Sequence, residues 1–399
     1  MSKKILILSA IYPADDIPKT FTPVVHYFTR EWVKLGYEVR VINYKTVFPK
    51  IFYWFLNFVK NYISSKVGYT VMGAAVTERN YTIEGVNVCR ICLKKLKPHG
   101  RFPAKEVENA LSKTVAYCNN SGFYPDVIIS HWSNPQLDIM CRLKEIYKVT
   151  TCYIAHDAGH FNEYGSDAKR IWKAVDLVGY RSLPIKRSFE TCPDYIKPSF
   201  MCYSGIPTKY NLNTVERTFD SVKRVAYVGA LVERKHPILI IQALVAVSNN
   251  DFILRYAGEG QQLDKIKALS KSLNVADKVF LLGRLNRDDV IKLLDDSDMF
   301  IMISENETYG LVYLEAMARG CITIASRNEG FDGIIQDGVN GFLCEAGNVN
   351  ELSRIIYKIK SMSSEERRQI SINAMKTAKI LTDKEVASNY ICHVLGEKM

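Results

Sequence analysis

The sequence of 399 residues contains no run of about 18 or more uncharged apolar residues, as a membrane-spanning helix would require. Its first residues, MSKKILILSAIYP, also lack the small-residue cleavage site of a secretory signal. The ten cysteines are scattered through apolar segments such as VTTCYIAHD, without the short, regular spacing of a disulfide framework. These absences predict a cytoplasmic protein whose cysteines are reduced.

A zinc motif is also missing. One close cysteine pair is present, Cys89 and Cys92 in VCRIC, but no second pair or histidine follows at ligand spacing. The cysteines are therefore interpreted as packing residues, and no metal site is expected.

Acidic residues are scarce in part of the chain. Residues 1–200 contain 28 Lys and Arg against 17 Asp and Glu, whereas the remaining residues contain 25 of each. Between Arg40 and Lys105, 12 basic residues meet only Glu78 and Glu84, and aromatic residues alternate with lysine in VFPKIFYWFLNFVKNYISSK. This pattern predicts binding to an anionic membrane surface or a polyanion; a solvated basic face over a core helix is the alternative.

Short apolar runs alternate with helical periodicity along the whole chain. In the first half the strand-like runs are KILILSA, YEVRVINY, DVIISHW, TTCYIAH, DLVGYR and FMCYSG. After a polar stretch near residue 210 the pattern restarts with RVAYVGAL, FILRYAG, KVFLLG, MFIMIS and CITIAS. This alternation is typical of an α/β fold with parallel sheets. We expect two domains, residues 1–210 and 211–381, and a helix within residues 382–399 that crosses back to the first domain.

Two carboxylates stand out in SENETYGLVYLEAMARG, residues 304–320. Glu307 and Glu315 are eight positions apart, around a glycine that opens an apolar helix. The helix follows a buried strand, so the free N–H groups of Tyr309, Gly310, Leu311 and Val312 are expected where phosphates bind in parallel α/β sheets. The carboxylates would accept hydrogen bonds from sugar hydroxyls.

Cations and further glycines follow two other strands of the second half. VGALVERKHP places Gly229, Arg234 and Lys235 after one strand, and arginine with lysine neutralises a diphosphate without a metal. AGEGQ places Gly258 after the next strand, where backbone can approach a ligand closely. Each loop alone is compatible with solvated charges or simple turns. Together, at the carboxyl ends of one sheet, the three loops predict a nucleotide-diphosphate site.

The segment ENETYGLVYLEAMARG resembles the E-x7-E signature of the retaining glycosyltransferase family 4, and GALVERK resembles the family's G-x-L-x-x-x-K loop. Members have the glycosyltransferase-B fold of two facing Rossmann-like domains. The resemblance implies that Glu315 binds the ribose, that Glu307 lies near the transferred sugar, and that Lys235 and Arg234 hold the diphosphate. The base would lie near Arg284.

The first half resembles the family as well. PDVIISHWSNP is similar to a strand of bacterial polysaccharide-type members, and YIAHD matches the strand that ends in an active-site histidine, here His156. The resemblance implies a catalytic role for His156, with His131 and Asp157 on the acceptor side; a structural role at a strand end is the alternative for both histidines. Two departures are present: Ala230 stands where the family usually has arginine, and AIYPADDIPKTFTP replaces the usual glycine pair after the first strand.

The resemblance implies a retaining hexosyltransferase that needs neither metal nor cofactor. It would move a sugar from a nucleotide-diphosphate sugar to a glycan acceptor, expected to be lipid-linked, in the biosynthesis of cell-surface polysaccharide such as capsule or lipopolysaccharide. The expected location is the inner face of the cell membrane, and nucleic acid is not an expected partner. A sugar-nucleotide 2-epimerase and a non-catalytic nucleotide-sugar-binding subunit are the alternatives.

Overall fold

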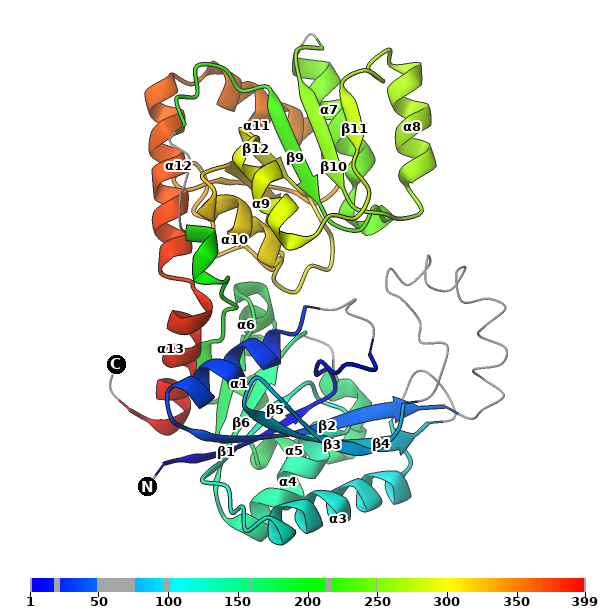
Figure 1. Ribbon diagram of the computed structural model, residues 1–399, viewed down its shortest axis with the longest axis vertical. Helices are drawn as coiled ribbons and strands as arrows, with labels where there is room; N and C mark the ends of the chain where they lie inside the picture. The colour runs from blue at the N-terminus through cyan, green and yellow to red at the C-terminus, as the bar shows by residue number, and fades with distance from the viewer. Residues whose placement is uncertain are drawn as a thin grey trace.

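The computed structural model describes residues 2–17, 22–48, 76–95, 101–157, 160–211, 217–248 and 250–397. Within these residues the chain forms two α/β domains, each built on its own sheet, and they stack along the long axis of the molecule in Figure 1. The predicted fold class, two Rossmann-like domains with parallel sheets, is confirmed.

The first domain is built on an eight-stranded sheet with the order β3-β4-β2-β1-β5-β6-β7-β8, in which only β3 is antiparallel to its neighbour. Its strands are β1 (Lys4–Ser9), β2 (Glu38–Val47), β3 (Arg79–Ile83), β4 (Val86–Lys94), β5 (Val127–His131), β6 (Thr150–Ala155), β7 (Leu177–Tyr180) and β8 (Ser199–Met201). Its helices are α1 (Val24–Lys34), α3 (Ala104–Asn120), α4 (Gln136–Tyr147), α5 (Ala168–Lys173) and α6 (Leu183–Glu190), with 3-10 turns η1 (His160–Asp167), η2 (Pro193–Tyr195) and η3 (Thr208–Asn211).

Both faces of this sheet are covered, which explains why its central strands are apolar throughout. Successive side chains of a strand point to opposite faces. Leu6 and Leu8 of β1 therefore join the core under α3 and α4, whereas Ile5 and Ile7 join the core under α1.

The second domain is built on a fully parallel six-stranded sheet with the order β11-β10-β9-β12-β13-β14. Its strands are β9 (Arg224–Val228), β10 (Ile253–Ala257), β11 (Val279–Leu281), β12 (Met299–Ile301), β13 (Ile322–Ser326) and β14 (Phe342–Cys344). Its helical segments are η4 (Glu233–Lys235), α7 (Pro237–Ser248), α8 (Leu263–Ser272), α9 (Arg287–Asp295), α10 (Leu311–Ala318), α11 (Val349–Ser361) and α12 (Ser364–Lys379).

The last helix, α13 (Asp383–Leu395), returns to the first domain and lies beside α1, as Figure 1 shows. Thr382 caps its N-terminus by accepting a hydrogen bond from the N–H of Glu385. The indole of Trp32 on α1 donates to the carbonyl of Ala387 over 2.7 Å. The crossing segment pairs with the outgoing link at Ile206, which donates to the Leu381 carbonyl over 3.1 Å. The C-terminal helix thus closes onto the first domain as predicted.

The basic, aromatic segment is described only in part. Its central residues Lys50, Phe52, Trp54, Phe55, Lys60 and Lys66 lie outside the described residues, and Phe48 is the last described residue before them. In the described part of the chain, no helix is long and apolar enough to cross a bilayer.

The sequence interpretation did not identify β3 and β4, which hold the close cysteine pair. Cys89 and Cys92 are three positions apart on β4, so their side chains point to opposite faces of the sheet and cannot share one ion. Among the described residues no group of three or more His, Cys, Asp or Glu side chains is placed to hold a metal.

Candidate active site between the two domains

A cavity of about 650 Å³ lies between the two domains, where the carboxyl ends of β5 and β6 face those of β9 and β12. It gathers most of the residues that the sequence analysis singled out: His156, Asp157, Gly229, Lys235, Glu307, Tyr309, Gly310, Leu311, Val312 and Glu315. It also includes residues that the analysis missed, among them Trp132, Arg181, Tyr210 and Arg287.

Lys235 and Glu307 form the charged centre of the second-domain wall. The ammonium of Lys235 lies 3.0 Å from the Glu307 carboxylate, and the two side chains are only 12% and 15% exposed. Arg234 lies 3.8 Å from the same carboxylate, but its side chain is 45% exposed and it does not line the cavity. Lys235 therefore points inward while Arg234 lies at the rim.

Backbone contacts fix the loop that carries Glu307. The carboxylate of Glu329 accepts hydrogen bonds from the N–H groups of Asn306 and Glu307, over 3.0 and 2.7 Å. The guanidinium of Arg234 donates to the carbonyl of Glu305 over 3.1 Å, and the Glu305 N–H donates back to the Arg234 carbonyl over 2.7 Å. Arg234 thus joins the two loops, and Glu329, which no motif identified, holds the turn.

Helix α10 begins at the cavity as predicted. Gly310 is its N-cap residue at φ 83°, and a Cβ atom there would lie 2.4 Å from the ring of Tyr313. Glycine is therefore required at this left-handed position. The ring of Tyr309 points to the domain junction, where its hydroxyl donates to the carbonyl of Ser204 over 2.7 Å. Leu311 and Val312, at the start of the helix, line the cavity.

Glu315 lies deeper on the same helix and is only 9% exposed. Burial raises the pKa of its carboxyl, while the nearby charge of Arg287 and the phenol of Tyr210 act in the opposite direction. A buried carboxylate with few competing partners is a strong acceptor for ligand hydroxyls. Arg287 begins α9 and has no motif of its own, so the sequence analysis did not identify it.

Besides Arg234, three predicted residues are not in this cavity. Gly258 packs on Gly229, and a Cβ atom on Gly258 would lie 1.9 Å from the Gly229 carbonyl oxygen. The close approach predicted for Gly258 is therefore to another loop of the protein. Arg284 lines a neighbouring cavity, and His131 is fully buried behind the first-domain side of this cavity.

The first-domain wall is built around stacked aromatic rings, and Asp157 and Arg181 also line the cavity from this side. His156 stacks on Trp132, with ring centroids 4.1 Å apart and 14° between the planes. Its Nε2 lies 3.0 Å from Nδ1 of the fully buried His131, whose Nε2 lies 3.2 Å from the hydroxyl of Tyr390 on α13. Burial, together with the nearby charge of Arg181, lowers the pKa of His131 well below its usual value. His131 is therefore a neutral link between α13 and His156, and it lies behind the surface that an acceptor would contact.

Arg181 joins this wall to the domain junction. It is 2% exposed and donates to the carbonyl of Cys202 over 2.7 Å and to the hydroxyl of Ser204. Its guanidinium lies over the rings of Tyr309 and Phe28. These contacts place a buried cation beside the cavity.

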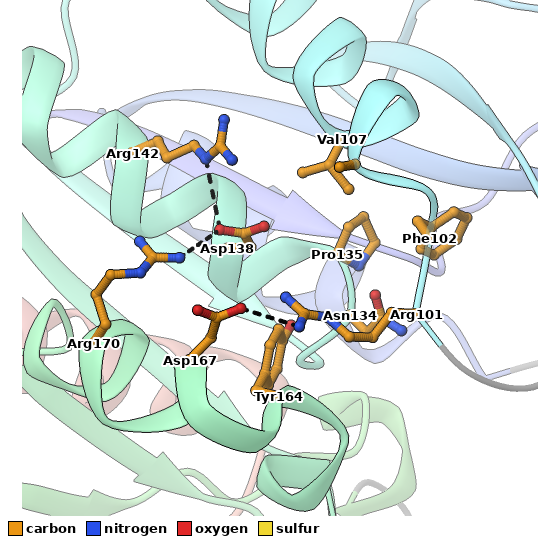
Figure 2. Close-up of a pocket in the computed structure, with 11 residues that line it drawn as sticks. Arg101, Phe102, Val107, Asn134, Pro135, Asp138, Arg142, Tyr164, Asp167 and Arg170 are labelled. Carbon is orange, nitrogen blue, oxygen red and sulfur yellow. Dashed lines mark hydrogen bonds and ion pairs between the residues drawn. The ribbon is translucent and has the colours of Figure 1, made fainter.

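A separate pocket of about 380 Å³ lies in the first domain, and Figure 2 shows its arginines held by carboxylates. Arg101 pairs with Asp167 over 3.1 Å, and Asp138 lies 3.6 Å from Arg142 and 3.4 Å from Arg170. Arg142 also pairs with Glu108, so each of the three arginines has a carboxylate partner and this pocket offers a ligand no unpaired arginine.

The chain was compared with known proteins and structures. A model of the family "Glycosyl transferases group 1" matches residues 212–377. The chain is 40% identical over 130 residues to N-acetyl-alpha-D-glucosaminyl L-malate synthase of Bacillus anthracis, covering 32% of this chain and 34% of that protein. It is 31% identical over 140 residues to the lipopolysaccharide core biosynthesis glycosyltransferase LpsE of Rhizobium meliloti, covering 35% of this chain and 40% of that protein. The chain thus spans only about a third to two fifths of these relatives.

The fold has matches over nearly the full length. The structure of Anabaena HepE in complex with UDP superposes with a TM-score of 0.68 at 18% identity, covering 98% of this chain and 99% of that one. The match to the group 1 glycosyl transferases covers residues 212–377, the part of the chain that holds the carboxylate pair and the inward lysine, and the whole chain has the glycosyltransferase-B fold.

Proposed function

We propose that the protein transfers a sugar from a nucleotide-diphosphate sugar to a glycan acceptor, with retention at the anomeric carbon. One observation carries the proposal. Lys235 and Glu307 on one wall face a cavity that His156 lines from the other wall. The cation would bind the diphosphate of the donor, the carboxylate would accept a hydrogen bond from a sugar hydroxyl, and the imidazole would contact the acceptor.

The donor would bind mainly to the second domain. Its diphosphate would lie at the N-terminus of α10 and against Lys235, and its ribose hydroxyls would donate to Glu315. As the bond between the anomeric carbon and the diphosphate oxygen breaks, negative charge grows on the leaving phosphate. Lys235 would stabilise that charge more strongly than the charge of the intact donor, and this difference accelerates the reaction.

The acceptor would approach from the first-domain wall. Its hydroxyl oxygen would bond to the anomeric carbon on the face from which the diphosphate leaves, and its proton would pass to the departing phosphate oxygen. Glu307 and His156 would orient sugar hydroxyls during this step. No protein nucleophile and no metal ion are needed in this scheme.

Nucleotide sugars should be screened first for thermal stabilisation, because a ligand at 100 times its dissociation constant adds about 2.7 kcal/mol. Uridine nucleotides come first in the screen, since HepE, which shares the fold, was crystallised with UDP. The stabilising donor is then incubated with glycan acceptors, and product anomers are identified by NMR. An α-linked product from an α-linked donor is expected. An inverted product would contradict the proposed stereochemistry.

The two alternatives differ in simple outcomes. A 2-epimerase would convert the nucleotide sugar without any acceptor. A non-catalytic subunit would bind the donor and leave it intact with every acceptor. Ala230 stands where the family usually has arginine, but Lys235 still points into the cavity beside Glu307. A cation therefore remains for the leaving diphosphate, and this favours transfer over the non-catalytic alternative.

A lipid-linked acceptor and docking on the inner membrane face are further parts of the proposal, motivated by the basic, aromatic segment. Each lysine close to an anionic bilayer contributes about 1 kcal/mol. Wild-type protein should sediment with anionic liposomes and bind less in about 0.5 M salt, where the Debye length is short. Changing Lys50, Lys60 and Lys66 to glutamate should abolish most of this binding and spare nucleotide-sugar binding. Wild-type protein that stays in the supernatant at low salt would favour a soluble acceptor.

A further inference from the structure

Lys45 lies at the carboxyl end of β2, on the sheet face that α1 covers. Val39 and Val41 of the same strand pack in the core under α1, so alternation places Lys45 on that face. Val88 of the adjacent strand β4 packs in the same core, which places Arg90 on the same face; it pairs with Asn43 and so lies diagonally from Lys45. Two cations are therefore near neighbours under the loop that follows β1.

Two carboxylates of that loop pair with arginines of the neighbouring strands and not with Lys45. Asp16 holds Arg90 through two parallel hydrogen bonds of 2.7 Å, and Asp15 pairs with Arg79. Lys45 makes no hydrogen bond or ion pair with any of the described residues. Burial lowers the pKa of its ammonium and the charge of Arg90 acts in the same direction, while the charge of Asp16 acts in the opposite direction. Among the described residues of the loop that replaces the glycine pair, no carboxylate contacts this partly buried cation, and Asp16 acts on it only from a distance.

Lys45 lines a second cavity, of about 920 Å³, between the domains. Arg284 and Arg287 line it from the second domain, and Thr22 and Arg287 also line the first cavity, so the two adjoin. The cavity's carboxylates already have partners. Asp15 pairs with Arg79, while Glu84 lies 3.6 Å from Arg30 and 3.5 Å from His26. Cationic side chains are therefore in excess here.

We propose that this second cavity binds the acceptor through an anionic group, a carboxylate or a phosphate, and that Lys45 is the residue that holds it. The inference rests on the proposed function, because only transfer requires an acceptor beside the donor cavity. A carboxylate or phosphate at Lys45 would supply a direct counter-ion, which none of the described residues provides, and a neutral sugar would not. Lys45 would thus select charged acceptors over neutral ones of the same shape.

Competitive acetylation of the wild-type protein, read by peptide mass spectrometry, tests the site without any transfer reaction. The probes are glucuronate, glucose 6-phosphate and farnesyl phosphate, with glucose as the neutral control. At ten times its dissociation constant, a probe that covers Lys45 should slow its acetylation about tenfold, as simple occupancy requires. Lys105, an exposed lysine of the same domain, should acetylate at an unchanged rate. Protection by glucuronate indicates a carboxylate, by glucose 6-phosphate a soluble phosphate, and by farnesyl phosphate alone a phosphate on a lipid.

Lys45→Met should abolish calorimetric binding of the protecting probe, and Lys105→Ala should retain it. If all three anions at about 10 mM, enough to fill even a millimolar site, protect Lys45 no better than glucose, the inference is wrong. Transfer to a neutral glycan in that case would leave the proposed function intact. Protection by an anion in a protein that transfers to no acceptor would instead uphold the anion site and overturn the function.

Discussion

The two walls of the cleft use different chemistry. The second-domain wall presents close charges of both signs on loops that directly follow strands, with Lys235 3.0 Å from Glu307. The first-domain wall presents a stacked Trp132 and His156 that rest on a buried, neutral histidine. A wall with close charges suits a donor that changes charge when its bond breaks, whereas a wall of stacked aromatic rings suits a sugar acceptor.

The walls also differ in how they are supported. The charged loop is held within the second domain by its backbone N–H groups, which donate to the Glu329 carboxylate, and by the Arg234 guanidinium, which donates to a loop carbonyl. The aromatic wall is supported through His131 by Tyr390, which α13 brings from the far end of the chain. We therefore expect substitutions on the charged wall to act on chemistry and donor affinity, and substitutions behind the aromatic wall to act through position.

Lys235→Ala should have the largest effect. Loss of one preorganised cation beside the leaving phosphate should lower kcat/KM by about 100-fold or more. Steady-state release of nucleoside diphosphate in the presence of acceptor measures this loss. Lys265→Ala, which changes an exposed lysine of α8, is the matched control and should be silent. Activity of Lys235→Ala within threefold of the parent would contradict the assignment.

Lys235→Ala also leaves Glu307 without its closest partner, so a second variant separates the two effects. If Lys235 served only to neutralise Glu307, Lys235→Ala/Glu307→Gln would recover activity relative to Lys235→Ala. We expect no recovery. Arg234→Ala tests the rim separately, and a loss there would come from its contacts with the Glu305 loop as well as from charge.

Glu307→Gln should come next. It removes charge-assisted acceptance from a sugar hydroxyl, worth about 1.5–3 kcal/mol, and so should lower kcat roughly 10- to 100-fold. Affinity for the free nucleoside diphosphate should change much less, because the carboxylate is expected near the sugar. Calorimetric titration compares the two, and an equal loss of nucleotide affinity would move Glu307 to the nucleotide.

Glu315→Gln should weaken donor binding by roughly 1–2 kcal/mol, since the amide keeps the shape of the carboxylate but accepts weaker hydrogen bonds from ribose. The same variant tests the raised pKa. A folded-state pKa above the unfolded value gives stability that is fully present at low pH and is lost as pH rises through the folded pKa. Glutamine does not titrate, so the melting temperature of Glu315→Gln, without ligand, should gain on the wild type from about pH 4.3 upward. A difference independent of pH would show that Arg287 and Tyr210 fully compensate burial.

Much of the charged wall could be predicted from the sequence. The strand after which each loop falls is read from local periodicity, and Lys235, Glu307, Gly310 and Glu315 all lie at the cavity. The glycine at position 258 correctly indicates a close backbone approach, but the approach is to Gly229 and not to a ligand. A local sequence pattern indicates that another group comes close to the backbone, but it does not identify that group.

The aromatic wall could be predicted only in part. His156 ends a strand and was identified, yet its support by Tyr390 joins residues that are far apart in sequence and carry no shared motif. The neutral state of His131 depends on burial against Phe28 of α1 and Tyr390 of α13, so the sequence could not show whether this strand-end histidine faces the cavity or the interior. Arg181 and Arg287 were missed for the same reason, because their place depends on the packing of one domain against the other.

Tyr390→Phe should have the smallest effect and is the sharpest test of the comparison. It removes only the hydroxyl that lies 3.2 Å from Nε2 of His131, in a fully buried position. The unpaired nitrogen should cost about 1–3 kcal/mol of stability. Nε2 of His156 is hydrogen-bonded to His131. Loss of the Tyr390 hydroxyl therefore allows the His131–His156 pair to change tautomer, and the pH profile of kcat should shift while the KM for the donor stays constant.

Tyr37→Phe is the control. It removes an exposed hydroxyl that contacts Glu397 on the same domain, and it should change neither the pH profile nor the stability. A Tyr390→Phe protein that is less stable but keeps the parent's pH profile would show that α13 supports the fold alone. A shifted profile at constant donor KM would show that α13 positions His156 for the reaction.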